Sequence, residues 1–297
     1  MRVRVGALGN LLTLSSTFGN RHAAPRLITS IAAQQSHRPF DQIHQHYVRM
    51  PALETQGVCV AVKLPPRCDE HFSCKAAIEQ LAHLEREYAA NKLPKRYRRA
   101  EFIAVRLALR RALLLADYSN IDQSYAFLKN DVGAPELTPN PGYFLPCSVS
   151  HTTNVAVGFI AKHNAVKSLE SSEVSIGVDI ENATRATNVM AKRRILSPAE
   201  RLVLGTVLKG RDVGVELTLR FSLKEAIFKA LHPLIMTHIP WHQVQVYPQA
   251  DGSCVVELAS QLSDATQGSI RAETRWTEFG CGKDVYFLST AAAQIVS

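Results

Sequence analysis

The stretch SIGVDIEN, residues 175–182, is a strand in which apolar residues occupy every second position. The positions between them hold small side chains and then two acids, Asp179 and Glu181. Because successive side chains of a strand point to opposite faces, the apolar set faces a core and both carboxylates lie on the other face. Neighbouring carboxylates repel each other unless a cation or a shared proton relieves them. The pair therefore indicates either a Mg²⁺ site or two ordinary solvent-facing acids of an edge strand.

Helices and strands are grouped around this stretch rather than alternating strictly, which favours an α+β fold over a doubly wound sheet. Apolar periodicity predicts helices, and alternating or continuous apolar runs predict strands. The predicted helices are 74–90, 98–116, one beginning at Ser197 with a capping box, and 216–231, ended by HPLI at 232–235. The predicted strands are 57–63, one that follows SVSH within 148–161, 174–181, 244–248, 254–259, 270–279 and 284–293.

A second candidate is FSLKEAIFKAL, residues 221–231. Glu225 and Lys229 are i,i+4 neighbours on one helix face, which is typical of a surface ion pair. Phe221 and Phe228 flank Glu225, however, and indicate that it is partly buried. A partly buried glutamate beside a lysine acts as a metal ligand or a general base.

A third candidate is SVSH, residues 148–151, before a predicted strand. Its serine and histidine are able to donate hydrogen bonds to a phosphate, although a histidine in this position is also commonly structural. A serine-hydrolase nucleophile is disfavoured, because the chain lacks the Gly-x-Ser-x-Gly elbow. Cys68, His71 and Cys74 lack a nearby fourth ligand, so we expect reduced thiols rather than a zinc site.

The net charge of +8 is uneven along the 297 residues. Residues 1–40 hold five arginines and no acid, which disfavours a nucleic-acid binder, because such a protein usually carries its charge as a patch on the fold. We expect residues 1–48 to be a disordered extension, a mis-started segment or a targeting peptide. No run of about 18 apolar residues occurs, so we expect no transmembrane segment and a cytoplasmic enzyme.

Taken in order, SVSH, IGVDIE and FSLKEAIFKAL resemble the motifs of the 4′-phosphopantetheinyl transferase superfamily. RRAEFIAVR (98–106) and RWTEF (275–279) extend the resemblance over about residues 90–290, within the enterobactin synthetase component D group. The resemblance implies an α+β fold that is a pseudo-two-fold pair of similar halves, residues 49–165 and 166–297, with coenzyme A (CoA) between them. It also implies a monomer.

The resemblance implies Mg²⁺-dependent transfer of 4′-phosphopantetheine from CoA to a serine of an apo acyl- or peptidyl-carrier protein, which releases adenosine 3′,5′-bisphosphate. The implied partners are acidic carrier domains of nonribosomal peptide or polyketide synthases, as in siderophore and enterobactin biosynthesis. The basic clusters 95–99 and Arg193–Arg194 are candidates for steering them. Two alternatives are a Mg²⁺-dependent phosphohydrolase acting on CoA-like pyrophosphates and a non-catalytic CoA binder.

By resemblance, the Mg²⁺ ligands are Asp179, Glu181, Glu225 and the Ile180 carbonyl, and the catalytic residues are Glu225 and Lys229. Whether Glu225 ligates the metal or deprotonates the serine stays open. The CoA-binding residues implied are Arg98, Arg99, Arg106, Pro135, Ser150, His151, Asp179, Lys224 and Lys229. The family's Gly-Lys-Pro loop is Gly133-Ala134-Pro135 here, so its lysine is missing.

Overall fold

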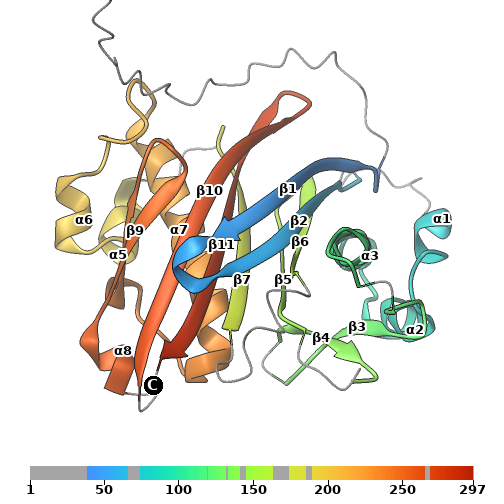
Figure 1. The fold of residues 1–297 in the computed structure, drawn as a ribbon. Helices are drawn as coiled ribbons and strands as arrows, with labels where there is room; N and C mark the ends of the chain where they lie inside the picture. Colours follow the sequence, from blue (N-terminus) through green and yellow to red (C-terminus); the bar gives the residue numbers. More distant parts are fainter. Residues whose placement is uncertain are drawn as a thin grey trace, which may run out of the picture. The chain divides into compact units, whose positions relative to one another are not determined.

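Two antiparallel sheets, each covered by one long helix, carry the candidate residues (Figure 1). The computed structural model describes residues 39–65, 74–118, 120–131, 133–140, 145–162, 174–184, 189–264 and 268–296. The first sheet has the order β1-β2-β6-β5, and helix α3 packs on β6 and β2. Its elements are β1 (Gln42–Met50), η1 (Pro51–Leu53), β2 (Thr55–Lys63), α1 (Lys75–Ile78), α2 (His83–Lys92), α3 (Arg96–Leu115), β5 (Cys147–His151) and β6 (Val155–Ala161), with a separate hairpin of β3 (Ala126–Lys129) and β4 (Pro135–Thr138).

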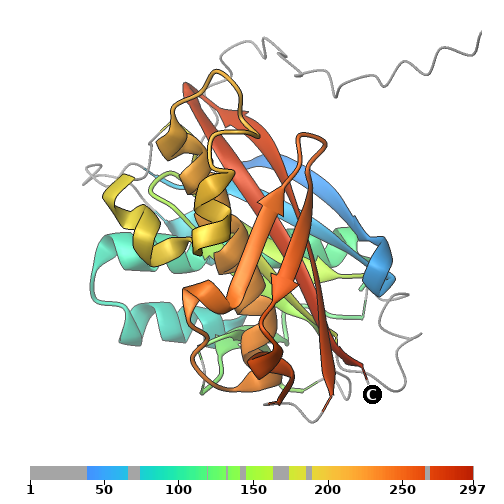
Figure 2. The ribbon, with the colours of Figure 1, turned by 90° about the vertical axis from the view of Figure 1, so that its left-hand side faces the viewer.

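The second sheet has the order β7-β11-β10-β9-β8, and helix α7 packs on β7 and β11. Figure 2 shows strands β8–β11 in front of this helix. The elements are β7 (Val174–Asn182), η2 (Val189–Ala191), α5 (Lys192–Ile195), α6 (Pro198–Leu202), α7 (Val213–Ile235), η3 (Trp241–Gln243), β8 (Val244–Pro248), β9 (Ser253–Leu258), α8 (Ser260–Asp264), β10 (Ser269–Cys281) and β11 (Asp284–Val296). The α+β fold class predicted from the sequence is confirmed.

Strand β7 is buried on both faces. Its apolar residues, including Ile176 and Val178, enter a core shared with β1, β2, β6 and β11, as their alternation predicts. The opposite face lies against α7, where a Cβ at Gly177 would overlap the carbonyl oxygen of Ala226. Because only a glycine allows this approach, the face that carries Asp179 is covered by the helix. The alternative of two solvent-facing acids is therefore wrong for Asp179, which is 4% exposed.

Two predicted helices have different bounds in the structure. The segment predicted as one helix over 74–90 is divided into α1 and α2, because the Glu85 carboxylate accepts a hydrogen bond from the Ala82 backbone N–H (2.9 Å) and begins a new helix there. Helix α7 extends to Ile235 and includes HPLI in its last turns, with Pro233 inside the helix. The capping box of Ser197 and Glu200 is confirmed at α6.

The folded chain includes residues from the segment predicted as an N-terminal extension. β1 begins at Gln42 and pairs with β2 through residue 50, so the expected boundary at 48 falls within a strand. Residues 1–38, the Cys68 and His71 pair, and the expected boundary at 165/166 lie outside the described residues. Among the helices that the structure describes, none is long and apolar enough to cross a membrane.

Candidate functional site

The two sheets meet where β5 runs beside β7, both of which are edge strands. The Val178 backbone N–H donates to the Ser148 hydroxyl (3.1 Å). Two residues on, the Ser150 hydroxyl donates to Asp179 Oδ1 (2.8 Å). Two serine side chains of β5 thus bond to β7, and they bring SVSH and the acidic strand into one site.

Asp179 lies at the centre of this site. Its Oδ1 accepts hydrogen bonds from Ser150 and from Lys229 Nζ (2.8 Å), and Lys229 also donates to the Val178 carbonyl (2.9 Å). Its Oδ2 is buried and has no hydrogen-bond partner within the described residues. A buried carboxylate oxygen without a partner is costly, so this atom is suited to a bound cation.

Three carboxylates gather around one lysine. Burial and then the charge of Asp179 raise the pKa of Glu181 to about 7, while Lys229 opposes the shift. Burial and then Asp179 also raise the pKa of Glu225. The excess negative charge and the oxygen donors fit Mg²⁺. Among the described residues, no group of three His, Cys, Asp or Glu side chains is already arranged to hold a metal ion.

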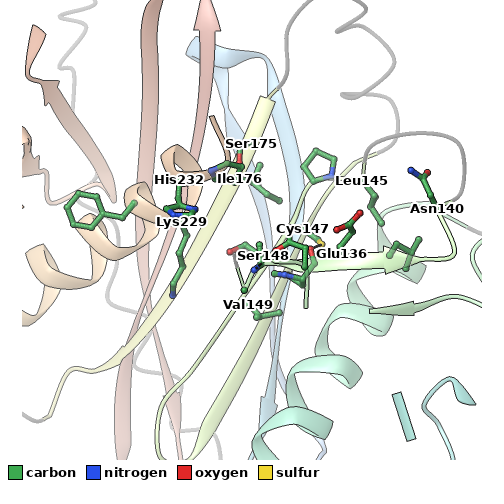
Figure 3. Close-up of a pocket in the computed structure, with 18 residues that line it drawn as sticks. Glu136, Asn140, Leu145, Cys147, Ser148, Val149, Ser175, Ile176, Lys229 and His232 are labelled. Carbon is green, nitrogen blue, oxygen red and sulfur yellow. Dashed lines mark hydrogen bonds between the residues drawn. The ribbon is translucent and has the colours of Figure 1, made fainter. Parts of the chain in front are cut away.

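A cavity of about 590 Å³ lies between β4 and β5 on one side and β7 and α7 on the other (Figure 3). Lys229 joins the cavity to the acids, because it lines the cavity and also binds Asp179. The walls come from the β3–β4 loop, β4, β5, β7 and α7, and they include Gly133, Ala134, Pro135, Glu136, Ser148, Ser175, Lys229 and His232. The volume is within the range of small-molecule sites.

Lys224 does not reach this cavity, which corrects its predicted contact with a phosphate. Its side chain is fully buried and its Nζ donates to Glu200 Oε2 (2.8 Å) and to the carbonyls of Ile195 (2.8 Å) and Trp241 (3.0 Å). All three ammonium protons are therefore used inside the protein. The residue stabilises the packing of α7 against α5, α6 and η3.

The predicted arginines are not among the residues that line the cavity. Arg106 is 2% exposed, its Nε–H donates to the Phe127 carbonyl (2.5 Å), and its guanidinium lies over the Phe102 ring. Burial lowers its pKa to about 10. Arg98 binds Glu101 (3.1 Å), and Arg99 donates to the Leu93 carbonyl (3.2 Å). All three hold contacts within the protein, while Arg106 Nη2 and Arg99 Nε are buried without a hydrogen-bond partner among the described residues.

Ser150 and His151 lie on the acidic side of the site rather than in the cavity lining. Ser150 contacts Asp179, and His151 Nδ1 lies 3.9 Å from Glu101 Oε1 of α3. Ile180 packs its side chain into the core, so the backbone carbonyl is the part of this residue left for a ligand.

Ser148 and His232 are cavity residues that the sequence analysis did not single out. Helical spacing was an available signal for His232, because it follows Lys229 by three residues and therefore shares its helix face. For Ser148, the quoted SVSH motif includes the residue. Its contact with β7 forms only because the two sheets meet, and a local sequence pattern does not predict how sheets pack against each other.

Comparisons with known proteins find related sequences. The sequence model of the 4′-phosphopantetheinyl transferase superfamily matches residues 175–278. A holo-[acyl-carrier-protein] synthase of Borrelia hermsii is 30% identical over 92 residues, which is 30% of this chain and 74% of that protein.

Solved structures give a partial match. The Chronobacterium ammoniagenes ACPS–CoA complex is 20% identical, with a TM-score of 0.31 over 42% of this chain and 99% of that one. The Plasmodium yoelii acyl carrier protein synthase with ADP bound is 17% identical, with a TM-score of 0.34 over 43% and 99%. Because these TM-scores are below 0.5, the assignment rests on the sequence comparisons.

The fold and the site define an α+β protein in which Lys229 joins an acidic cluster to a cavity between two sheets. The sequence comparisons then identify the family: the chain belongs to the 4′-phosphopantetheinyl transferase superfamily.

Proposed function

We propose that this protein transfers 4′-phosphopantetheine from CoA to a serine of an apo carrier protein, with Mg²⁺ as cofactor. The observation that carries the proposal is the buried, unpartnered Oδ2 of Asp179, within a cluster of three carboxylates beside the cavity. A pyrophosphate is an anion, so an acidic site of this kind would bind it only together with a cation. The family relationship supplies the reaction.

In the proposed mechanism, Asp179, Glu181, Glu225 and the Ile180 carbonyl hold the metal. When bound, Mg²⁺ neutralises the pyrophosphate and orients in-line displacement. Lys229 extends its ammonium between Asp179 and the cavity, where it stabilises charge on the phosphate that leaves with the nucleotide. Glu225 either completes the metal site or accepts the proton of the attacking serine. Its raised pKa suits a base, and its place beside Asp179 suits a ligand.

The cavity takes the nucleotide of CoA in this proposal. Pro135 and its neighbours Gly133 and Ala134 form the wall opposite α7, and they offer backbone groups to the base in place of a lysine. Ser150 orients Asp179 through its hydrogen bond. Because Ser150 and His151 lie on the acidic side, we assign them to the pyrophosphate end of CoA.

The carrier is proposed to be an acidic domain of a nonribosomal peptide or polyketide synthase. Basic and exposed apolar side chains lie together on η2, α5 and α6, among them Arg193, Arg194, Met190 and Leu202. Such a surface fits an acidic helix with an apolar stripe. We further propose a cytoplasmic monomer of two similar halves, of the enterobactin synthetase component D group, that serves siderophore synthesis.

The test is a transfer assay on the full chain. The protein is incubated with CoA, Mg²⁺ and several apo carrier domains, and the intact mass of each carrier is measured. We expect a gain of one phosphopantetheine group on a peptidyl carrier that depends on Mg²⁺. Cleavage of CoA without any modified carrier would contradict the proposal and indicate a hydrolase.

A further inference from the structure

The cavity is lined by a histidine, His232, near the end of α7. Among its described lining residues, Lys229 and His232 are those able to carry positive charge. Lys229 already donates to Asp179 and to the Val178 carbonyl. The His232 imidazole has no hydrogen-bond or ion-pair partner within the described residues, so its ring nitrogens are available to a ligand.

His232 lies farther from the carboxylates than Lys229 does. It follows Lys229 by three residues on α7, while Glu225 precedes Lys229 by four. On β7 the cavity is lined by Ser175 and Ile176, which precede Asp179 in the strand. Figure 3 shows His232 and Lys229 beside Ser175, across the cavity from Glu136. The cavity thus extends from Lys229 past His232, away from the acids.

We infer that His232 is a further ligand-binding residue, which holds a phosphate group of the nucleotide and does so more strongly when protonated. The inference rests on the proposed function for the identity of the ligand. An imidazole changes its charge between about pH 5 and 8, so the affinity of the cavity for a phosphorylated nucleotide gains a pH dependence from this residue.

The other titratable groups facing the cavity do not supply this charge. Cys147 on β5 is buried, which raises its pKa to about 12 and keeps it a neutral thiol. Glu136 on β4 is an acid and repels a phosphate. Lys229 on α7 is held by Asp179. A protonated His232 therefore raises the net positive charge of the cavity at a position where Lys229 does not reach.

The experiment measures nucleotide affinity by calorimetry at pH 6.0 and 8.0. The ligands are adenosine 3′,5′-bisphosphate, ADP and AMP. The proteins are wild type, His232→Gln, His232→Lys and the control Asp251→Asn, in the exposed turn between β8 and β9. At pH 6.0 we expect wild type to bind adenosine 3′,5′-bisphosphate, ADP or both about tenfold more tightly than His232→Gln does. At pH 8.0 the ratio falls to about twofold, while His232→Lys binds tightly at both pH values.

The ratio of wild type to His232→Gln cancels the titration of the ligand's own phosphates. An effect on ADP assigns the contact to the pyrophosphate, and an effect on the 3′,5′-bisphosphate alone assigns it to the 3′-phosphate. An equal ratio at both pH values for every ligand overturns the inference, provided thermal unfolding shows that the variants are folded. Failure of wild type to modify any carrier, with the pH-dependent ratio intact, instead overturns the proposed function and leaves the His232 site standing.

Discussion

Helix α7 carries two lysines five residues apart, and each belongs to a different buried charge cluster. Lys224 pairs with one carboxylate, Glu200, whose other oxygen accepts the Val246 backbone N–H (3.0 Å). Lys229 faces three carboxylates and leaves Asp179 Oδ2 without a partner among the described residues. The first cluster is balanced in charge, whereas the second has an excess of negative charge.

The difference separates a structural cluster from a functional one. A buried pair whose donors and acceptors are all satisfied needs nothing from outside the protein. A cluster with three acids and one lysine is stable only if it keeps protons or binds a cation. Four changes test this comparison.

The largest expected effect is on stability, from Lys224→Met. The change leaves Glu200 buried without its partner, so we expect the free energy of unfolding to fall by about 3–5 kcal/mol. Urea unfolding measures the loss. Transfer per folded molecule should be unchanged, because Lys224 does not reach the cavity. A variant of wild-type stability with poor transfer would reverse the roles given to the two lysines.

The next effect is on activity, from Asp179→Asn. We expect the transfer rate to fall by about 10²–10³-fold, because the central oxygen ligand of the site is lost. The melting temperature should change little, since the substitution also removes a source of repulsion. Asp251→Asn, in the exposed β8–β9 turn, is the matched control. Full transfer by Asp179→Asn would remove this residue from the proposed metal site.

A smaller effect concerns pH in metal-free protein held in chelator. The pKa of Glu181 rises from 4.5 to about 7 on folding, so the folded chain binds this proton more tightly than the unfolded chain does. The contribution of Glu181 to stability is therefore fully present below about pH 4.5 and decreases by about 1–3 kcal/mol as the pH rises to about 7. Glu181→Gln should flatten this dependence, and Mg²⁺ with nucleotide should oppose it in wild type. A flat wild-type profile would contradict the charge excess.

The smallest effect is expected from Arg98→Ala. The Arg98 side chain is 57% exposed and pairs with Glu101, and such pairs contribute less than about 1 kcal/mol. Thermal unfolding and the Michaelis constant for CoA should both stay near wild type. A large rise in that constant, without a change in stability, would restore the nucleotide contact predicted for Arg98 from the sequence.

The sequence predicted the parts of the site that depend on local pattern. The alternation in β7 predicted its core face, and the spacing of Glu225 and Lys229 predicted their shared face. The contact between Asp179 and Ser150 joins two sheets and was accessible only through the family resemblance. Lys224 was mistaken for a ligand although five helical residues turn about 140°, which directs it away from Lys229.

Arg106 shows a second limit of the sequence analysis. An arginine in a basic helix is ordinarily exposed, yet α3 is buried around most of its middle turns. The hairpin β3–β4 covers Arg106 and accepts its hydrogen bond at Phe127. The position of that hairpin is set by tertiary packing, which the helical periodicity of residues 98–116 does not contain.

Gly177 has a consequence for how this enzyme tolerates change. The glycine allows the backbone of α7 to touch β7, so a larger residue separates the helix that carries Glu225 and Lys229 from the strand that carries Asp179. The two sides of the site share no covalent connection nearby, and their spacing is set by one missing methyl group. Residue 177 bears no reactive atom. In a library randomised at this position and selected for carrier modification, we nevertheless expect the accepted amino acids to be as few as at the acidic positions.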